Sequence, residues 1–458
     1  MSELAGAELV ERALAAAQAD ATVVVVQESS AVNLRWAGST LTTNGAARDR
    51  RITVISIVGR GFGVRSATTV TDLDELTALV RVAEEAARGA SEAEDFGELV
   101  DGGTDAGFGA GPELTGTAVL EGFARDLGTA FDAASGDGML LYGFASYELA
   151  TTWLGTSAGT RRRHVQPTGS VEWNARSGLP GGSVWHGQST RDFTDVDVEG
   201  TVAGLATRLG WTSRQLELPA GRYETLLPPT AIADLLIYAW WTMAGRDAAE
   251  GRTVFSRAGG GTRIGEALAP AGLDLSSDPA RPGLQVAPFT VATGSSAHES
   301  VFDNGLALQR TDWIHDGRLG ALIETRAGGR ERGVRATPPI DNLILDGGGT
   351  ASLEDMVGRT ERGLLLTCLW YIREVDPETL LLTGLTRDGV FLVEGGEVVG
   401  AVNNFRFNES PVDLLGRIAE VGAATRTLPR EWSDYFTRAV APTVRVPDFN
   451  MSSVSPAS

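Results

Sequence analysis

The pair His298-Glu299 is the first feature of the sequence that could perform chemistry, because it begins like the HExxH motif of zinc peptidases. That motif needs a second histidine one helical turn later, so that two imidazoles on one face hold the metal. Position 302 is phenylalanine, position 303 is aspartate, and residues 295–305 contain few helix-forming residues. We therefore expect a loop here. A metal site that pools His298, Glu299 and His315 stays open as an alternative.

Two residues that could act as nucleophiles, Ser157 and Cys368, are interpreted as structural. The segment from Gly155 to Gly159 matches the GxSxG pattern of serine hydrolases, which requires a strand, a sharp turn and a helix around the serine. Residues 160–173 instead have the pattern of an arginine-rich strand, so we predict a hairpin turn. The single cysteine, Cys368, lies in a segment predicted to be an apolar strand and is predicted to be a buried, unreactive thiol.

The composition excludes several classes of function. The 458 residues carry a net charge of −20, which disfavours binding to nucleic acid or to an anionic membrane. All 39 basic residues are arginine, so a Walker A phosphate loop and a lysine Schiff base are excluded. One cysteine cannot form an intrachain disulfide or a CxxC zinc site, and it suits a reducing compartment.

The same sequence predicts a cytoplasmic location. Its first 20 residues mix acidic residues with alanine and leucine and lack the basic and apolar regions of a signal peptide. The most apolar helical stretch, residues 231–245, contains an aspartate and is shorter than the roughly 20 residues that a membrane span needs.

The periodicity of apolar residues predicts an α+β protein with three domains. Residues 1–110 are expected to form an N-terminal α/β domain, with two helices on a hairpin-rich sheet that turns at Asn44-Gly45. Residues 111–220 are expected to form a small middle domain. Residues 221–458 are expected to form a mainly antiparallel β domain packed with a long helix.

That long helix is the best-defined element of the sequence. It begins at Pro228-Pro229-Thr230, carries apolar residues at helical spacing and is predicted to end near Glu250. A final helix is predicted to begin at Ser410-Pro411 and to bury residues as far as Val421.

The sequence resembles the TldD/PmbA (TldE) family over nearly its whole length, most strongly over the last third. The stretches that carry the resemblance are Gly221–Pro229, Gly251–Ser256, Phe302–Gly305, Trp313–Leu319, Leu369–Pro377, Thr383–Gly389 and Asn404–Pro411. The resemblance implies a pair of subunits. The catalytic member carries HExxxH on a long helix, and two histidines with a distal cysteine hold zinc while the glutamate activates water.

The corresponding helix of this chain, residues 230–246, contains neither histidine nor glutamate, and residues 442–458 contain no cysteine. The resemblance therefore implies a PmbA/TldE-type, non-catalytic subunit that holds no metal, with zinc in a TldD-type partner. The complex is expected to act on unfolded or small modified peptides, by proteolysis or by a specialised amide reaction of peptide maturation. Arg373, Asn404 and Arg406 are the residues expected nearest a peptide held by strand addition.

Two alternatives remain open at this stage. The first is a stand-alone metalloenzyme with the histidine-based ligands described above. The second is a scaffold protein that binds peptides without hydrolysing them.

Overall fold

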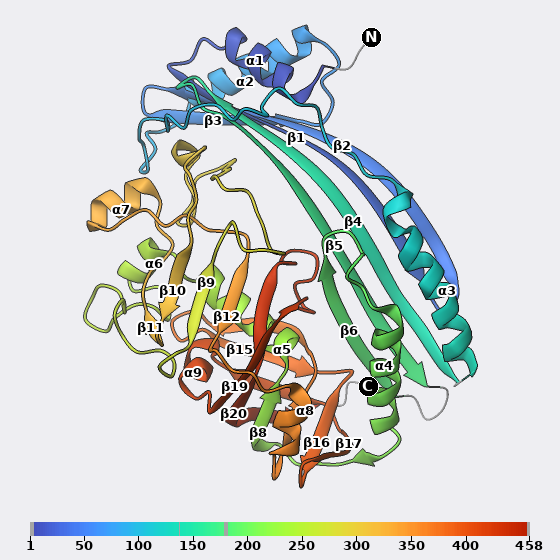
Figure 1. Cartoon of the computed structure of the whole chain (residues 1–458). Coiled ribbons are helices and arrows are strands. Elements are labelled where there is room, and N and C mark those ends of the chain that lie inside the picture. The colour runs from blue at the N-terminus through green and yellow to red at the C-terminus, as the bar shows by residue number, and fades with distance from the viewer. Residues whose placement is uncertain (1–3, 137, 178–181, 456–458) are drawn as a thin grey trace.

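The computed structural model describes residues 4–136, 138–177 and 182–455, so the ends of the predicted domains at 1–3 and 456–458 lie outside the described residues. The protein is α+β, as predicted, and its strands form two sheets (Figure 1). The first is fully antiparallel, with the order β3-β2-β1-β4-β5-β6. Its strands are β1 (Ala21–Trp36), β2 (Leu41–Val58), β3 (Gly61–Ala67), β4 (Met139–Thr156), β5 (Arg161–Ser177) and β6 (Ser183–Thr190).

The first part of strand β1 is buried on both faces, which explains its run of valines. Val24 and Val26 pack with helices α1 (Gly6–Ala16) and α2 (Leu73–Arg88) on one face. Val23 and Val25 point to the opposite face and pack against side chains from residues 289–302. Successive side chains of a strand alternate between faces, so a strand covered on both sides has no polar positions to alternate with.

Figure 1 shows the first sheet as a long arch, with helices on its outer face and the C-terminal half against its inner face. The outer helices at the far end of the arch are α3 (Glu121–Gly136) and α4 (Val198–Trp211). Their core contains Trp36, Phe123 and Trp173 together with Leu365 and Phe391 of the C-terminal half, so the two halves share this core.

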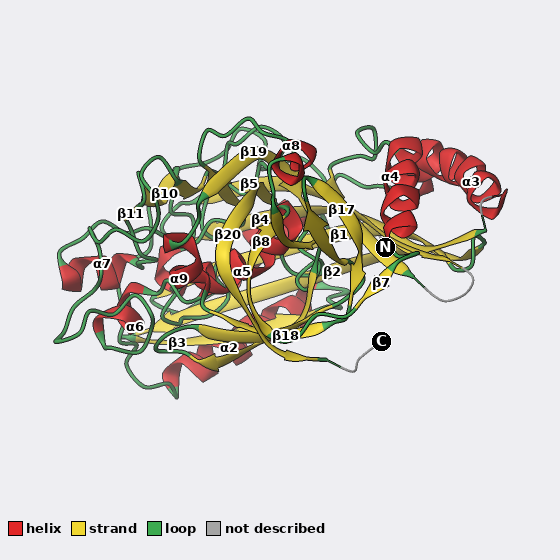
Figure 2. Cartoon of the chain, turned by 90° about the horizontal axis from the view of Figure 1, so that it is seen from below, coloured by secondary structure: helices red, strands yellow, loops and turns green. Residues whose placement is uncertain are grey.

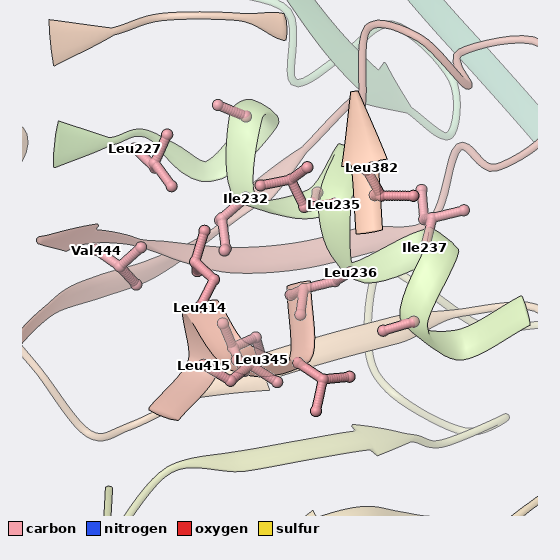
Figure 3. Close-up of a cluster of buried hydrophobic side chains, with 14 of the residues drawn as sticks. Leu227, Ile232, Leu235, Leu236, Ile237, Leu345, Leu382, Leu414, Leu415 and Val444 are labelled. Carbon is pink, nitrogen blue, oxygen red and sulfur yellow. The ribbon is translucent and has the colours of Figure 1, made fainter. Parts of the chain in front are cut away.

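The second sheet wraps around helix α5 (Pro229–Trp241), which lies inside it (Figure 2). The side chains of α5 contact Leu382, Val444 and the short helix α9 (Pro411–Gly416) in one core (Figure 3). The strands of this sheet are β7 (Gln215–Leu216), β8 (Gly221–Leu227), β9 (Asp274–Ser277), β10 (Thr311–His315), β11 (Arg318–Leu319), β12 (Leu343–Asp346), β13 (Arg362–Leu366), β14 (Leu369–Asp376), β15 (Leu381–Thr386), β16 (Val390–Glu394), β17 (Glu397–Val402), β18 (Phe405–Glu409), β19 (Glu420–Thr427) and β20 (Ala439–Val454). The remaining helices are α6 (Gly245–Ala249), α7 (Arg326–Arg332) and α8 (Leu353–Gly358), with 3-10 turns η1 (Thr117–Leu120) and η2 (Val301–Asp303).

Three predicted elements differ from the structure. Asn44-Gly45 is not a turn, because Gly45 pairs with Asn33 inside the β1–β2 ladder and the chain reverses at residues 37–40. Helix α5 ends at Trp241 and a separate short helix follows, so the predicted single helix to Glu250 is wrong. Val421 belongs to strand β19 rather than to the last helix, which ends at Gly416.

The six strands of the first sheet come from both the predicted N-terminal and middle domains. The boundary at residue 110 thus lies in a loop between strands of one sheet, and the division into an N-terminal and a middle domain stays a prediction. Within the described residues, no helix is long and apolar enough to cross a membrane.

Candidate functional site

Helix α5 carries one buried carboxyl group, Asp234. Asp234 is fully buried, and its two carboxylate oxygens accept hydrogen bonds from the backbone N–H groups of Arg430 (3.1 Å) and Glu431 (3.0 Å). Burial raises the pKa of Asp234 well above its usual range, against the effect of these two hydrogen bonds. The carboxyl group therefore holds the segment 430–435 against α5.

The two residues that Asp234 holds reach in different directions. The guanidinium of Arg430 pairs with Asp388 (2.5 Å) and lies over the ring of Trp370. The carboxylate of Glu431 accepts hydrogen bonds from the backbone N–H of Tyr371 and from Nη1 of Arg373, both at 2.9 Å. Strand β14 is thereby fixed beside the end of α5.

Four aromatic side chains pack against one another here, and the backbone N–H of Tyr371 is bound to Glu431, next to Trp432 in the chain. We call these five residues the aromatic surface: Tyr238, Trp241, Tyr371, Trp432 and Tyr435. Trp432 packs edge-on against Trp241 (4.6 Å between ring centroids), Tyr238 (5.4 Å) and Tyr435 (6.0 Å). Tyr435 is 75% exposed and Tyr371 is 55% exposed. Large exposed aromatic side chains that adjoin one another are typical of a surface that binds a partner or a ligand.

Strand β14 is an edge strand, since among the described residues it pairs only with β15. Part of its outer edge is occupied. The hydroxyl of Tyr238 donates to the carbonyl oxygen of Ile372 (2.7 Å), next to the N–H of Tyr371 that Glu431 accepts. Burial raises the pKa of Tyr238 to about 12, so this hydroxyl remains a donor at neutral pH. The exposed outer edge runs from Arg373 to Val375.

The structure brings two of the three predicted contact residues onto one face of the sheet. Arg373 lies opposite Thr383 of β15, and Arg406 of β18 donates to the hydroxyl of Thr383 (3.3 Å). Both arginines are exposed. Asn404 lies just before β18, and its carbonyl oxygen accepts the N–H of Ser455. Contact of these residues with a peptide stays a prediction.

The alternative metal site is not assembled. Nε2 of His298 donates to the carbonyl oxygen of Trp241 (2.7 Å), whereas His315 is 70% exposed at a hairpin tip, 3.2 Å from Asp274. Within the ranges that the structure describes, no three His, Cys, Asp or Glu side chains form a group that could hold a metal ion. The donor groups of this part of the chain therefore do not fit a zinc site.

The two possible nucleophiles have structural positions. Ser157 lies in the hairpin turn between β4 and β5, as predicted, and its hydroxyl accepts the N–H of Thr22. Cys368 is fully buried, as predicted, but it lies in the link between β13 and β14 rather than in a strand. Burial raises its pKa, which keeps the thiol protonated and unreactive.

Sequence reasoning missed Asp234, Arg430 and Glu431, which organise the surface. Asp234 is almost 200 residues away from Arg430 and Glu431 in the sequence, so no local pattern connects it with them. The available signal was Asp234 itself, a charged residue within an otherwise apolar helix, because such a residue needs hydrogen-bond partners.

Comparisons with known proteins add the family relationship. The family model of the PmbA/TldA metallopeptidase C-terminal domain matches residues 220–453, and that of PmbA/TldA metallopeptidase domain 1 matches residues 22–90. No curated protein matches the sequence. Among solved structures, TldE from Thermococcus kodakarensis is similar over 96% of this chain and 98% of its own, with a TM-score of 0.80 and 15% identity.

Two further similar structures are described as modulators of DNA gyrase. The protein from Thermotoga maritima gives a TM-score of 0.77 at 16% identity, with 97% of this chain and 99% of that chain covered. The protein from Bacteroides thetaiotaomicron gives 0.75 at 14% identity, with 97% of each chain covered. At these identities the similarity establishes the fold.

Proposed function

Because the chain belongs to the PmbA/TldD metallopeptidase family, we propose that it is a non-catalytic, TldE/PmbA-like subunit of a heterodimeric zinc metallopeptidase. Its partner is a TldD-type chain that holds the zinc, and the pair acts in the cytoplasm on unfolded or small modified peptides. This chain contributes a binding surface and no metal ligand.

The observation that supports the proposal most directly is that the side chains of helix α5 have structural contacts. Its one acidic side chain, Asp234, is buried and bound to two backbone N–H groups, and most of its other side chains pack in the core. The helix thus holds the 430–435 segment and presents Tyr238 and Trp241 at its end. A zinc-binding helix would instead direct imidazoles and a carboxylate into an open site.

The aromatic surface and the neighbouring edge of β14 supply two modes of binding. Adjoining aromatic side chains such as Trp432 and Tyr435 bury large areas when a partner subunit covers them. The edge from Arg373 to Val375 offers backbone groups to a short extended peptide. Such backbone pairing tolerates many peptide sequences, which suits unfolded substrates.

The test compares the chain alone with the chain co-expressed with a TldD-type protein. Zinc is measured by mass spectrometry of the metal, and molar mass by light scattering. We expect no stoichiometric zinc in the chain alone, and one zinc in a 1:1 complex. Stoichiometric zinc in the isolated chain, or failure to form a complex, would contradict the proposal.

A variant locates the partner surface. Tyr435→Ser removes a 75% exposed ring that is not needed in the core, and we expect about tenfold weaker complex formation. Phe144→Ser is the matched control, since this ring is 38% exposed on the first sheet. Equal affinities of the two variants would show that the partner does not cover the aromatic surface.

Peptide binding at the exposed edge of β14 also allows a test of the alternative that the chain is a peptide-binding scaffold. If the zinc-loaded complex binds an unfolded peptide through this edge but never cleaves it, the chain is a peptide-binding scaffold. Cleavage by the complex, and none by either chain alone, supports the metallopeptidase subunit.

A further inference from the structure

A second site lies where the two halves of the chain meet, and it shares no residue with the aromatic surface. It is a pocket of about 810 Å³. Its walls come from β6 and α4 of the N-terminal half, and from α8, β17, β19 and the segment before α5 (Figure 1). A volume of this size is typical of sites for small molecules.

The pocket contains a half-buried cation without a counter-ion. Arg208 of α4 donates to the carbonyl oxygens of Trp185 (3.2 Å) and Gly204 (3.4 Å). Among the described residues it forms no ion pair, whereas most partly buried arginines of this protein do. Burial lowers the pKa of Arg208, because no neighbouring carboxylate offsets the loss of hydration. An uncompensated guanidinium in a pocket favours an anionic ligand.

A neutral imidazole lies in the same pocket. The backbone of His186 pairs with Trp173 in the β5–β6 ladder, and its imidazole has no hydrogen-bond partner among the described residues. Burial, with a contribution from Arg208, lowers its pKa to about 4. At neutral pH the ring therefore offers one donor and one acceptor and adds no charge. The acidic residues of the lining, Glu354 and Glu397, are both exposed, so water screens their charge.

The remaining walls are suited to an apolar body. Half-buried apolar side chains of Trp211, Leu353 and Val357 line the pocket. Trp185 also lines it but is only 4% exposed, and its indole N–H donates to the carboxylate of Glu172 (3.3 Å). Gly204 also lines it, within helix α4, where glycine costs about 1 kcal/mol relative to alanine. A Cβ at this position would approach only Nη2 of Arg208, at 4.0 Å. Packing therefore does not require glycine here, and its absence of a side chain keeps the space beside the guanidinium open.

We propose that this pocket binds a small carboxylate with an aromatic or apolar body. The carboxylate is held by the guanidinium of Arg208, and the body lies against Trp211, Leu353 and Val357. The proposal does not depend on the function assigned to the aromatic surface, because the ligand binds the isolated chain.

The probe is 1-naphthaleneacetate, and its uncharged amide, 1-naphthaleneacetamide, is the control of the same shape. Binding is measured by calorimetry on the full chain at neutral pH. We expect one site for the acid and at least tenfold weaker binding of the amide, as for a hydrogen bond to a charged group. Equal affinities, or no binding of the acid at millimolar concentration, would overturn the proposal.

Two variants locate the ligand. Arg208→Gln should weaken binding of the acid about tenfold and leave binding of the amide unchanged. Arg125→Gln, an exposed residue of α3, makes the same change in net charge away from the pocket and should have no effect. Gly204→Leu fills the space beside Arg208 and should abolish binding of both probes. Because leucine favours the helix, this variant should fold at least as well. Full binding by either pocket variant would place the ligand elsewhere and overturn the proposal.

Discussion

Two arginines lie beside Trp185, and their surroundings differ. Arg430 lies 5.5 Å from the centre of the Trp185 ring, pairs with Asp388 and donates to the sulfur of Cys368 (3.0 Å). Arg208 donates to the backbone carbonyl of Trp185 and has no acidic partner among the described residues. Arg430 is thus neutralised by a carboxylate of the protein, whereas Arg208 lines a pocket and has no counter-ion among the described residues.

The direction of each pKa shift reflects this difference. Burial lowers the pKa of Arg208. At Arg430 burial acts in the same direction, but the hydrogen bond to the sulfur of Cys368 and the carboxylate of Asp388 outweigh it and the pKa is raised. A buried charge that is paired with a counter-ion holds chain segments together, whereas a buried charge without a counter-ion can still pair with a charged ligand. The comparison therefore separates a structural arginine from a binding arginine, and the following variants test that separation.

The largest effect is expected at Asp388. Asp388→Asn removes the counter-ion of Arg430 and leaves the guanidinium buried, which should lower the free energy of unfolding by about 3 kcal/mol. Asparagine is the suitable replacement, because residue 388 has a positive φ of 55° that asparagine tolerates. Urea denaturation measures the change.

Glu394→Gln is the control for that variant, since it breaks the exposed pair with Arg362 and should cost less than about 1 kcal/mol. If Asp388→Asn costs no more than this control, Arg430 is not held by its counter-ion and the comparison fails.

The next effect is the pH dependence of stability caused by His186, which lines the same pocket as Arg208. The folded state depresses the pKa of His186 to about 4, below the ordinary value near 6.5. Between these values the unfolded chain binds more protons, so stability is complete above pH 6.5 and falls as the pH drops towards 4. In the wild type we expect the free energy of unfolding to fall by an amount on the order of 2 kcal/mol over this pH range, and in His186→Gln this fall should be absent. His315→Gln is the control, because this ring is 70% exposed. Parallel stability profiles for wild type and His186→Gln would contradict the assignment.

Local signals explain which parts of the fold could be predicted. Asp72 caps α2 by accepting the N–H groups of Asp74 and Glu75, which lie within three residues of it. The turn at Asp316-Gly317 likewise needs only its own positive φ values. Asn44-Gly45 failed because the long β1–β2 ladder overrides a local turn preference, and the reversal falls at Gly38-Ser39, both with positive φ.

The candidate sites were less predictable because they depend on contacts between distant segments. Arg373 was predicted as a contact residue from its place in a strand, but its partner Glu431 is 58 residues away. Arg208 carries no sequence signal of its own. Its lack of an acidic neighbour becomes visible only when α4, β6 and the C-terminal half are brought together.

A smaller effect is expected at Arg208 itself. Arg208→Met removes the cation and keeps an unbranched apolar side chain, so the free energy of unfolding should change by less than about 1 kcal/mol. Arg430→Met should cost about 3 kcal/mol, because it leaves Asp388 buried without its partner. Urea denaturation of both variants gives the contrast directly. A large loss for Arg208→Met would make Arg208 a structural residue like Arg430.

The smallest effect on stability is expected at Arg373. Its ion pair with Glu431 joins a side chain that is 61% exposed to one that is 8% exposed, so water screens the pair from one side. Arg373→Gln should lower the free energy of unfolding by about 0.5 kcal/mol, since glutamine still reaches the carboxylate as a neutral donor. If Arg373 contacts peptide or partner, the same variant should weaken complex formation with a TldD-type chain several-fold, with no further loss of stability. Arg362→Gln, which is 64% exposed and paired with Glu394, is the matched control. Equal complex affinities for the two variants would remove Arg373 from the binding surface and leave it, like Arg430, a residue that holds the 430–435 segment in place.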